Sequence, residues 1–331
     1  MPLNPLRWSH RVKLIAAFAA LYIVWGSTYL GIRIGLESGM PVTLFAGMRL
    51  VPAGVLLLAF AAARGTRLRI PFDEYRLVAT VGILLLVGGM YSTFLSERYI
   101  PSGLAALIVA LLPLWVALAE SFVPGMDRPS ARGYVGLVVG FAGLGVLMAP
   151  RLTGISGTPT ELLGVATQIL GTWLWTGGSI LSKRRPVKTD ALVATGYEML
   201  TAGAVLLVIG TVNGEWAGAR ITVTGAAALA YLIVFGSCVA FTAFVWLLRN
   251  APASKVMTYA YINPVIAVFL GWTAGRLGWV PPEPVDGWVL AGMAIIVAGV
   301  ALTTSAPTRP GMLPAPSPEA ESAVAAPLRT S

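Results

Sequence analysis

Residues 41–63 read PVTLFAGMRLVPAGVLLLAFAAA, an apolar stretch interrupted by one charged residue, Arg49. A helix of about 20 residues is long enough to cross the roughly 30 Å hydrocarbon layer of a membrane. Runs of this kind recur along almost the whole chain. They lack the alternating pattern and the length of about ten residues that are typical of membrane β-strands. The sequence therefore predicts membrane-spanning helices.

The composition supports lipid, rather than water, as the solvent of most of the chain. Of 331 residues, 56% are hydrophobic and 11% are charged, and the mean hydropathy is +0.79. Soluble domains are about 25% charged. The net charge of +9 is carried by short clusters between apolar runs and not by one polar face. Membrane orientation explains it better than nucleic-acid binding does.

Ten spans are predicted from the lengths of the runs and from their Pro, Gly and charged boundaries. They cover residues 14–34, 41–63, 75–95, 101–121, 132–149, 161–181, 191–212, 224–248, 252–273 and 286–304. The first run lacks the small-residue cleavage site of a signal peptide and is predicted to be retained. Residues 305–331, rich in Pro, Ala and Ser, are predicted to form a disordered cytoplasmic tail.

Basic residues predict the orientation, because cytoplasmic loops hold most Lys and Arg. Of the 23 basic residues, 17 fall on one side of the predicted spans, five on the other, and Arg49 inside a span. This places both termini in the cytoplasm, with residues 1–13 as a cytoplasmic segment. The expected location is the inner (plasma) membrane, as a multi-pass protein.

The sequence contains an internal repeat, which is seen when the chain is aligned with itself at an offset of about 150 residues. The shift superposes Trp25 on Trp175, Arg33 on Lys183, Arg98 on Arg249, Pro101 on Pro252 and Pro113 on Pro264. Two copies of an odd number of spans must have opposite orientations. The predicted fold is therefore all-α, with ten transmembrane helices in two inverted five-helix repeats, residues 14–149 and 160–304.

Four short motifs carry a family resemblance. They are WGSTY at 25–29, GMRL at 47–50, NPV at 263–265 and LGW at 270–272. In this order the chain resembles the EamA-like branch of the drug/metabolite transporter superfamily, over roughly residues 14–304. The resemblance implies ten helices in two inverted repeats around a central cavity, and commonly export of amino acids, metabolites or toxic compounds.

One departure from that family limits what can be transferred. Many members carry Gly-Glu after the fourth and ninth helices, where this chain has Gly125-Met126 and Gly275-Arg276. Any role of the family glutamates therefore does not carry over to this chain.

The function class follows partly from missing motifs. The sequence has no aspartate-rich metal motif, His-Glu-x-x-His, Gly-x-Ser-x-Gly or Walker A sequence. We expect no enzyme, no metal and no cofactor. The expected function is a secondary transporter, an exporter of small organic metabolites, amino acids or drugs that works by alternating access. A flippase of lipids or lipid precursors and a noncatalytic membrane sensor or scaffold are the alternatives. The expected partners are a small-molecule substrate and the bilayer, with no nucleic acid, for a monomer or homodimer. Protons are a further partner if transport is proton-coupled, and facilitated flow without coupling is the alternative.

Three charged residues inside predicted spans are candidates for substrate binding or coupling, because a charge at the bilayer centre is costly. Arg49 could attract an anionic substrate group or pair with a carboxylate. Alternatively, it could snorkel outward or bind backbone carbonyls at a helix break. Glu198, opposite Met48 in the repeat, is the first choice for a proton carrier, and a static ion pair is the alternative. Glu120, opposite Gly271, could also carry a proton or could reach the cytoplasmic headgroups.

Aromatic, amide and proline residues complete the candidates. A small-molecule cavity is mostly apolar with a few placed polar groups. This makes candidates of Trp25, Tyr91, Gln168, Trp175 and Tyr259. Trp and Tyr also occupy interfaces and helix contacts, so packing is the alternative. Mid-helix prolines kink helices, and Pro113 and Pro264 are predicted to be hinges or fixed bends. Small residues such as Gly136 and Gly140 predict close helix contacts.

Overall fold

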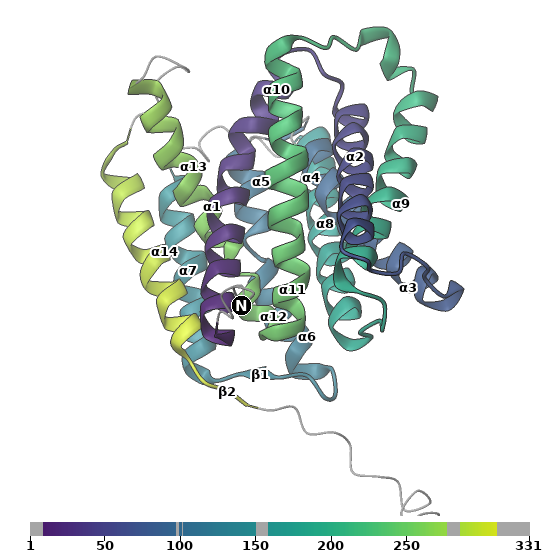
Figure 1. Cartoon of the computed structure of the whole chain (residues 1–331). Helices are drawn as coiled ribbons and strands as arrows, with labels where there is room; N and C mark the ends of the chain where they lie inside the picture. The colour runs from purple at the N-terminus through teal and green to yellow at the C-terminus, as the bar shows by residue number, and fades with distance from the viewer. Residues whose placement is uncertain (1–8, 97–98, 101, 150–157, 277–284, 310–331) are drawn as a thin grey trace, which may run out of the picture.

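The computed structural model describes residues 9–96, 99–100, 102–149, 158–276 and 285–309, which form a bundle of roughly parallel helices (Figure 1). The first half comprises α1 (His10–Glu37), α2 (Val42–Ala63), α3 (Phe72–Gly82), the π-helical η1 (Ile83–Met90), α4 (Tyr91–Ser96), α5 (Ser102–Val109), α6 (Leu112–Phe122) and α7 (Ala131–Met148). The second half comprises α8 (Pro159–Arg184), α9 (Ala191–Val212), the short 3₁₀ helix η3 (Glu215–Gly218), α10 (Val223–Tyr231), the π-helical η4 (Leu232–Phe241), α11 (Thr242–Asn250), α12 (Ala253–Val256), α13 (Tyr259–Arg276) and α14 (Gly287–Ser305).

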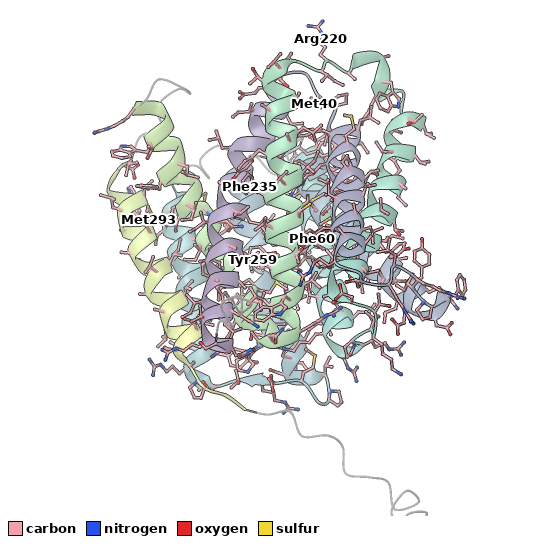
Figure 2. The ribbon with its side chains drawn as sticks, viewed as in Figure 1. Met40, Phe60, Arg220, Phe235, Tyr259 and Met293 are labelled. Atoms are coloured by element: carbon pink, nitrogen blue, oxygen red, sulfur yellow. The ribbon has the colours of Figure 1, made fainter. Side chains whose placement is uncertain are left out.

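Within these ranges, eight helices are long and apolar enough to cross a membrane. They are α1, α2, the continuous rods Phe72–Ser96 and Val223–Asn250, α7, α9, Ala253–Leu270 and α14. Large apolar side chains lie exposed on their outer faces, as Phe60 and Phe235 do in Figure 2. Exposed apolar surface of this extent suits a lipid environment. The prediction of an all-α membrane protein is confirmed.

The helices begin where polar side chains can bind their first backbone N–H groups. Ser130 caps α7, and Asp190 accepts bonds from the amides of Leu192 and Val193 in α9. Thr158 and Glu161 form a capping box that starts α8. These three helices start within two residues of the predicted boundaries, at the positions that the capping side chains fix.

Helices α2 and α9 pack against each other along glycines. A side chain at Gly47 would meet Leu207, and one at Gly54 would meet the Gly196 carbonyl oxygen at 2.7 Å. Further along α9, Gly210 faces Leu44. Residue numbers rise along α2 as they fall along α9, so the pair is antiparallel. The missing side chains allow the backbones to approach closely.

Helices α7 and α14 form a second antiparallel pair with the same chemistry. Gly136 faces Thr303 and Gly299, and Gly143 faces Ile296. The predicted close contact at Gly136 and Gly140 is therefore made inside the chain. At the lower end of this pair in Figure 1, strands β1 (Arg128–Pro129) and β2 (Thr308–Arg309) join antiparallel.

The predicted fourth and ninth spans differ from expectation. The segment 101–121 is interrupted between α5 and α6, and Pro113 lies in the first turn of α6. There its missing N–H removes no helical bond, because first-turn N–H groups have no intrahelical partner. Pro264 instead lies inside α13, and the chain is interrupted earlier, between α12 and α13. The two prolines are thus not in matching local structures.

The predicted tail begins with ordered structure. Helix α14 extends to Ser305, and Thr308 and Arg309 pair with β1. A disordered segment from residue 305 is therefore wrong for 305–309, where backbone pairing holds the chain. The rest of the predicted tail, 310–331, and residues 1–8 of the predicted N-terminal segment lie outside the described residues.

Candidate functional site

Arg49 and Glu198 occupy the same place in two matching helices. Helices α2 and α9 are each 22 residues long and start at residues 42 and 191, a shift of 191 − 42 = 149. This register aligns Gly47 with Gly196 and Arg49 with Glu198. A uniform shift of 150 places Glu198 opposite Met48, which differs from this register by one residue because the two helix starts are 149 residues apart.

The Arg49 side chain is held inside the bundle. It is 7% exposed, and its Nε donates a hydrogen bond to Ser237 Oγ at 2.9 Å. Its Nη2 lies beside Gly236, where an added Cβ would be 2.9 Å away. Both contacts are on the π-helical segment η4, and π-helical turns occur frequently at functional sites. The contacts show that Arg49 does not snorkel outward.

The Glu198 side chain is buried with fewer contacts. It is 3% exposed, and Oε2 has no hydrogen-bond partner among the described residues. Arg249 on α11 interacts with it electrostatically, and Arg249 Nε is also buried without a described partner. The backbone of Glu198 lies against Gly82, where an added Cβ would be 2.7 Å from the Glu198 carbonyl oxygen. A buried carboxyl without hydrogen bonds is costly, which marks the site as a functional candidate.

Five rings from α1, α8, η4, α11 and α13 form a packed aromatic cluster. Its members are Trp25, Trp175, Phe241, Phe244 and Tyr259. The Trp25 ring lies 4.7 Å from Tyr259 and 5.8 Å from Trp175, centroid to centroid. All five side chains are at most 9% exposed. Figure 2 shows Tyr259 inside the lower half of the bundle.

The aromatic cluster meets the Arg49 site at η4. Trp25 Nε1 donates a hydrogen bond of 3.0 Å to the Gly236 carbonyl, and Gly236 also lies against Arg49. The structure therefore connects four predicted residues: Arg49 and Trp25 both contact Gly236 of η4, and Trp25 in turn contacts Trp175 and Tyr259. In contrast, Trp175 Nε1 is buried without a described partner.

Tyr91 and Gln168 belong to separate polar contacts. The Tyr91 hydroxyl bonds Thr43 Oγ1 at 2.9 Å, and Thr43 in turn donates to Glu215 at 2.6 Å. Gln168 accepts a 2.6 Å bond from Ser96, which ties α8 to α4. Both groups link helices. Tyr91 also packs against the buried core that contains the aromatic cluster, whereas neither residue has a described hydrogen bond to Arg49.

Glu120 is fully buried and binds backbone. Its carboxylate accepts hydrogen bonds from the amides of Ala253 at 2.7 Å and Ser254 at 3.1 Å. Lys183 Nζ lies 3.9 Å from Glu120 Oε1 and donates to the Ala251 carbonyl at 2.7 Å. A carboxylate reaching the headgroups is therefore wrong for Glu120, since its exposure is 0%. It satisfies N–H groups at the start of α12, where Pro252 offers no side-chain cap.

Ser237 and Gly236 were missed by the sequence analysis. A small residue next to a hydroxyl in an apolar span signals a close polar helix contact. That signal does not identify the partner. Phe241 and Phe244 were also missed, because a phenylalanine in a membrane span gives no cue to which neighbours it faces.

Known proteins resemble the chain over most of its length. The chain is 36% identical over 300 residues to a protein named inner membrane transporter YedA, of Escherichia coli strain K12, with 90% of this chain and 93% of the relative covered. It is 26% identical to the Bacillus subtilis transporter YvbV, covering 89% and 92%. A crystal structure of a protein with 21% identity matches with a TM-score of 0.74 over 89% of this chain and 97% of the other, which shows a shared fold.

The family assignment rests on a match to both halves. The sequence model of the EamA-like transporter family matches residues 12–149 and again residues 162–305. These segments contain all of the site residues described above. The chain is a membrane protein and belongs to the EamA-like transporter family.

Proposed function

We propose that the chain is a secondary transporter that exports small organic molecules by alternating access. It lies in the inner membrane with both termini in the cytoplasm. Its ten spans are the eight long apolar helices together with α8 and the α5–α6 segment. They form two inverted repeats, residues 14–149 and 160–304, and one repeat rocks against the other during transport.

The antiparallel packing of matching helices is the observation that carries this proposal. Helix α2 corresponds to α9, and α7 corresponds to α14 in the order of elements. Each matching pair packs antiparallel through glycines. Equivalent helices that run in opposite directions are expected of an inverted repeat. The π-helical segments η1 and η4, each inside the third span of its half, support the same relation.

Substrate passes, in this proposal, between the halves at the aromatic cluster. Trp25 and Trp175 are repeat equivalents, and their rings meet at 5.8 Å. The rings are packed together in the described conformation, so a substrate enters only when the halves separate. Apolar walls with one cation suit an organic molecule that carries an acidic group. Arg49 has N–H donors beyond its bond to Ser237 and would bind that group.

Glu198 is the proton carrier of the proposed cycle. Among the described residues it has no hydrogen bond to hold its charge, and Arg249 is its one charged neighbour. Opening of the halves would change its solvation, and a carboxyl that alternates between burial and water can bind and release a proton. Glu120 is less suited, because backbone N–H groups hold its carboxylate in place.

Metabolite profiling tests the transport proposal. Medium from cells that overexpress the wild-type chain is compared with medium from cells expressing Arg49→Ala with Glu198→Gln at matched membrane levels. We expect at least one acidic organic compound to accumulate outside only with the wild type. Gly145→Ala is the control, because a side chain there meets no atom within 4 Å. Identical profiles for all three would contradict export.

Flux into proteoliposomes tests proton coupling separately. With the compound found by profiling, an imposed pH gradient should accelerate wild-type flux. The Glu198→Gln variant should still exchange substrate but should ignore the gradient. Wild-type flux that does not respond to the gradient would remove proton coupling and leave facilitated transport.

A further inference from the structure

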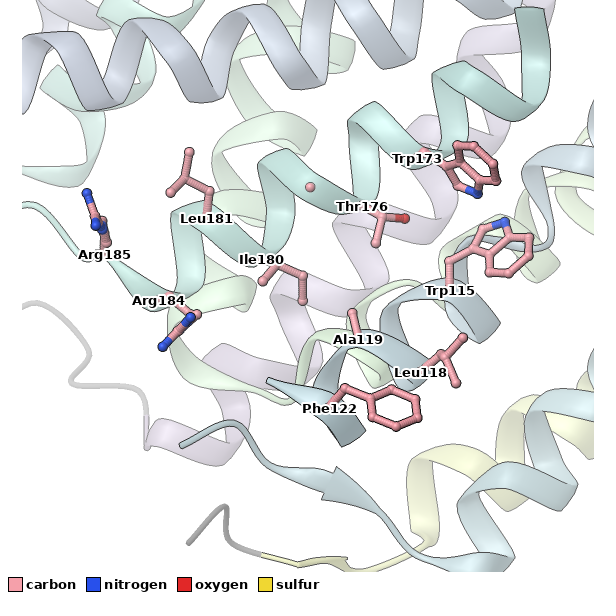
Figure 3. Close-up of a pocket in the computed structure, with 11 residues that line it drawn as sticks. Trp115, Leu118, Ala119, Phe122, Trp173, Thr176, Ile180, Leu181, Arg184 and Arg185 are labelled. Atoms are coloured by element: carbon pink, nitrogen blue, oxygen red, sulfur yellow. The ribbon is translucent and has the colours of Figure 1, made fainter. Parts of the chain in front are cut away.

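A groove runs along the outside of the bundle between α6 and α8. Its volume is about 870 Å³. Figure 3 shows Trp115 and Trp173 at one end and Arg184 and Arg185 at the other, with apolar side chains such as Ile180 between them. The two indole rings are 6.3 Å apart and connect α6 to α8. The groove is thus apolar along its length and basic at one end.

The open floor of the groove is made by a glycine. A Cβ added at Gly177 would meet no atom within 4 Å, so the space over it is empty. The surrounding walls are accessible, since Leu118, Phe122 and Trp173 are 47%, 75% and 55% exposed. An elongated apolar ligand can therefore lie along α8 without displacing a side chain.

The length of the groove matches one leaflet of a bilayer. Trp173 and Arg184 are 11 residues apart on α8, which corresponds to about 16 Å of helix at 1.5 Å per residue. Half of the hydrocarbon layer is about 15 Å thick. With α8 spanning the membrane as proposed, the tryptophans lie near the midplane and the arginines lie near the headgroups.

The charges at the basic end are available to a ligand. Three consecutive basic residues end α8, and Lys183 turns inward toward Glu120 and the Ala251 carbonyl. Arg184 and Arg185 are exposed and line the groove. Across the described part of the chain neither guanidinium has a hydrogen bond or ion pair. Guanidinium groups bind phosphate bidentately, and basic pockets between membrane helices bind anionic lipid headgroups.

We infer that the α6–α8 groove binds one anionic phospholipid, with an acyl chain along Gly177 and the phosphate against Arg184 and Arg185. The inference rests on the membrane placement of α8 in the proposed function. The lipid would come from the leaflet at the C-terminal end of α8, which is the cytoplasmic leaflet, where anionic lipids lie. It would be a bound component of the transporter and not its cargo.

Native mass spectrometry of the full-length protein in detergent tests this inference. The purified protein is incubated with equal amounts of phosphatidylglycerol and phosphatidylethanolamine. We expect retention of one phosphatidylglycerol, preferred about 25-fold, because each basic residue near the headgroup contributes about fivefold. Arg184→Gln with Arg185→Gln should abolish the preference. Gly177→Leu fills the groove and should lower retention of both lipids.

A control variant at another glycine distinguishes a filled groove from a general loss of stability. Gly145→Leu on α7 also adds a side chain to open space, and it should retain lipid as the wild type does. Equal retention of both lipids by the wild type, or equal loss in Gly145→Leu and Gly177→Leu, would overturn the inference. Light scattering tests whether a second copy of the chain occupies the groove instead. A wild-type dimer that becomes a monomer in Gly177→Leu would overturn the inference in favour of that second copy. Lipid retention is measured without substrate, so the lipid result can be interpreted even if the transport proposal fails.

Discussion

Helices α2 and α9 are two versions of one element with opposite charges at the same position. Both are 22 residues long, and both pack through glycines at matching places. In α2, the eighth residue is Arg49, which Ser237 binds at 2.9 Å. In α9, the eighth residue is Glu198, whose Oε2 has no described partner. The packing is therefore shared, and the polar chemistry is not.

This difference separates what the repeat needs from what the function needs. Glycines at the contact let two backbones approach, and both halves require them for the same reason. A buried charge stabilises neither helix by itself, because its removal from water costs free energy. Opposite charges at equivalent positions are thus not explained by the shared scaffold. They are consistent with the separate roles that we propose, in which Arg49 binds an anionic group and Glu198 carries a proton.

The largest expected effect on stability comes from substitutions of the glycines at matching positions of α2 and α9. Leucine at Gly54 or at Gly203 would force a side chain into backbone of the facing helix, where the nearest backbone atoms lie 2.7 Å and 2.9 Å from the Cβ position. We expect each variant to lose about 3 kcal/mol of stability. Thermal unfolding in detergent, with Gly145→Leu as the control, measures it. If only one of the two glycines were sensitive, the two helices would not be equivalent in packing.

The second effect concerns Arg49. Arg49→Gln removes the charged donor to Ser237 and should cost about 2 kcal/mol, since hydrogen bonds of charged groups contribute about 1.5–3 kcal/mol. Ser237→Ala should destabilise less than Arg49→Gln and should keep partial transport, because it leaves the guanidinium in place. The same unfolding assay and flux measurements distinguish the two. Full transport by Arg49→Gln would remove Arg49 from the substrate site.

Replacement of Glu198 is expected to raise the stability of the protein, whereas replacement of Arg49 lowers it. Glu198→Gln replaces a buried carboxyl, which lacks described hydrogen bonds, by a neutral group of the same shape. Stability should rise by about 1 kcal/mol at a pH where the buried carboxyl is ionised, because the cost of burying that charge disappears, and should change little where the carboxyl is protonated. The midpoint of thermal unfolding, compared with that of Arg49→Gln, measures the difference. A large loss of stability would indicate that the Arg249 interaction is a structural ion pair.

The smallest effect distinguishes the two tryptophans of the repeat. Trp25→Phe removes the 3.0 Å hydrogen bond to the Gly236 carbonyl and should cost about 1 kcal/mol more than Trp175→Phe. Trp175 Nε1 has no described partner, so its loss removes only ring area. Comparing the two variants controls for the change of ring size. Equal effects would mean that the Trp25 hydrogen bond contributes nothing to stability.

The candidate site was only partly predictable from the sequence. Residue type and span position predict Arg49, Trp25, Trp175 and Tyr259, and the structure connects them through Gly236 of η4 and the Trp25 ring. Tyr91 and Gln168 were chosen by the same reasoning, yet they tie neighbouring helices together. A polar residue in a span predicts a partner, because an unpaired polar group in lipid is costly. Which partner it finds depends on helix rotation, which the sequence does not state.

The sequence by itself determined that most of the chain lies in lipid and that it is helical. Apolar runs of this length are stable in lipid only when their backbone N–H and C=O groups hydrogen-bond to one another, as they do in a helix. It also predicted the order of elements and the family. Only the tertiary structure decided that Arg49 binds Ser237 and that Glu120 binds the start of α12. These contacts join residues 133 or more positions apart, and they depend on how helices dock and rotate. Local composition does not encode that geometry, because many helix faces are equally apolar.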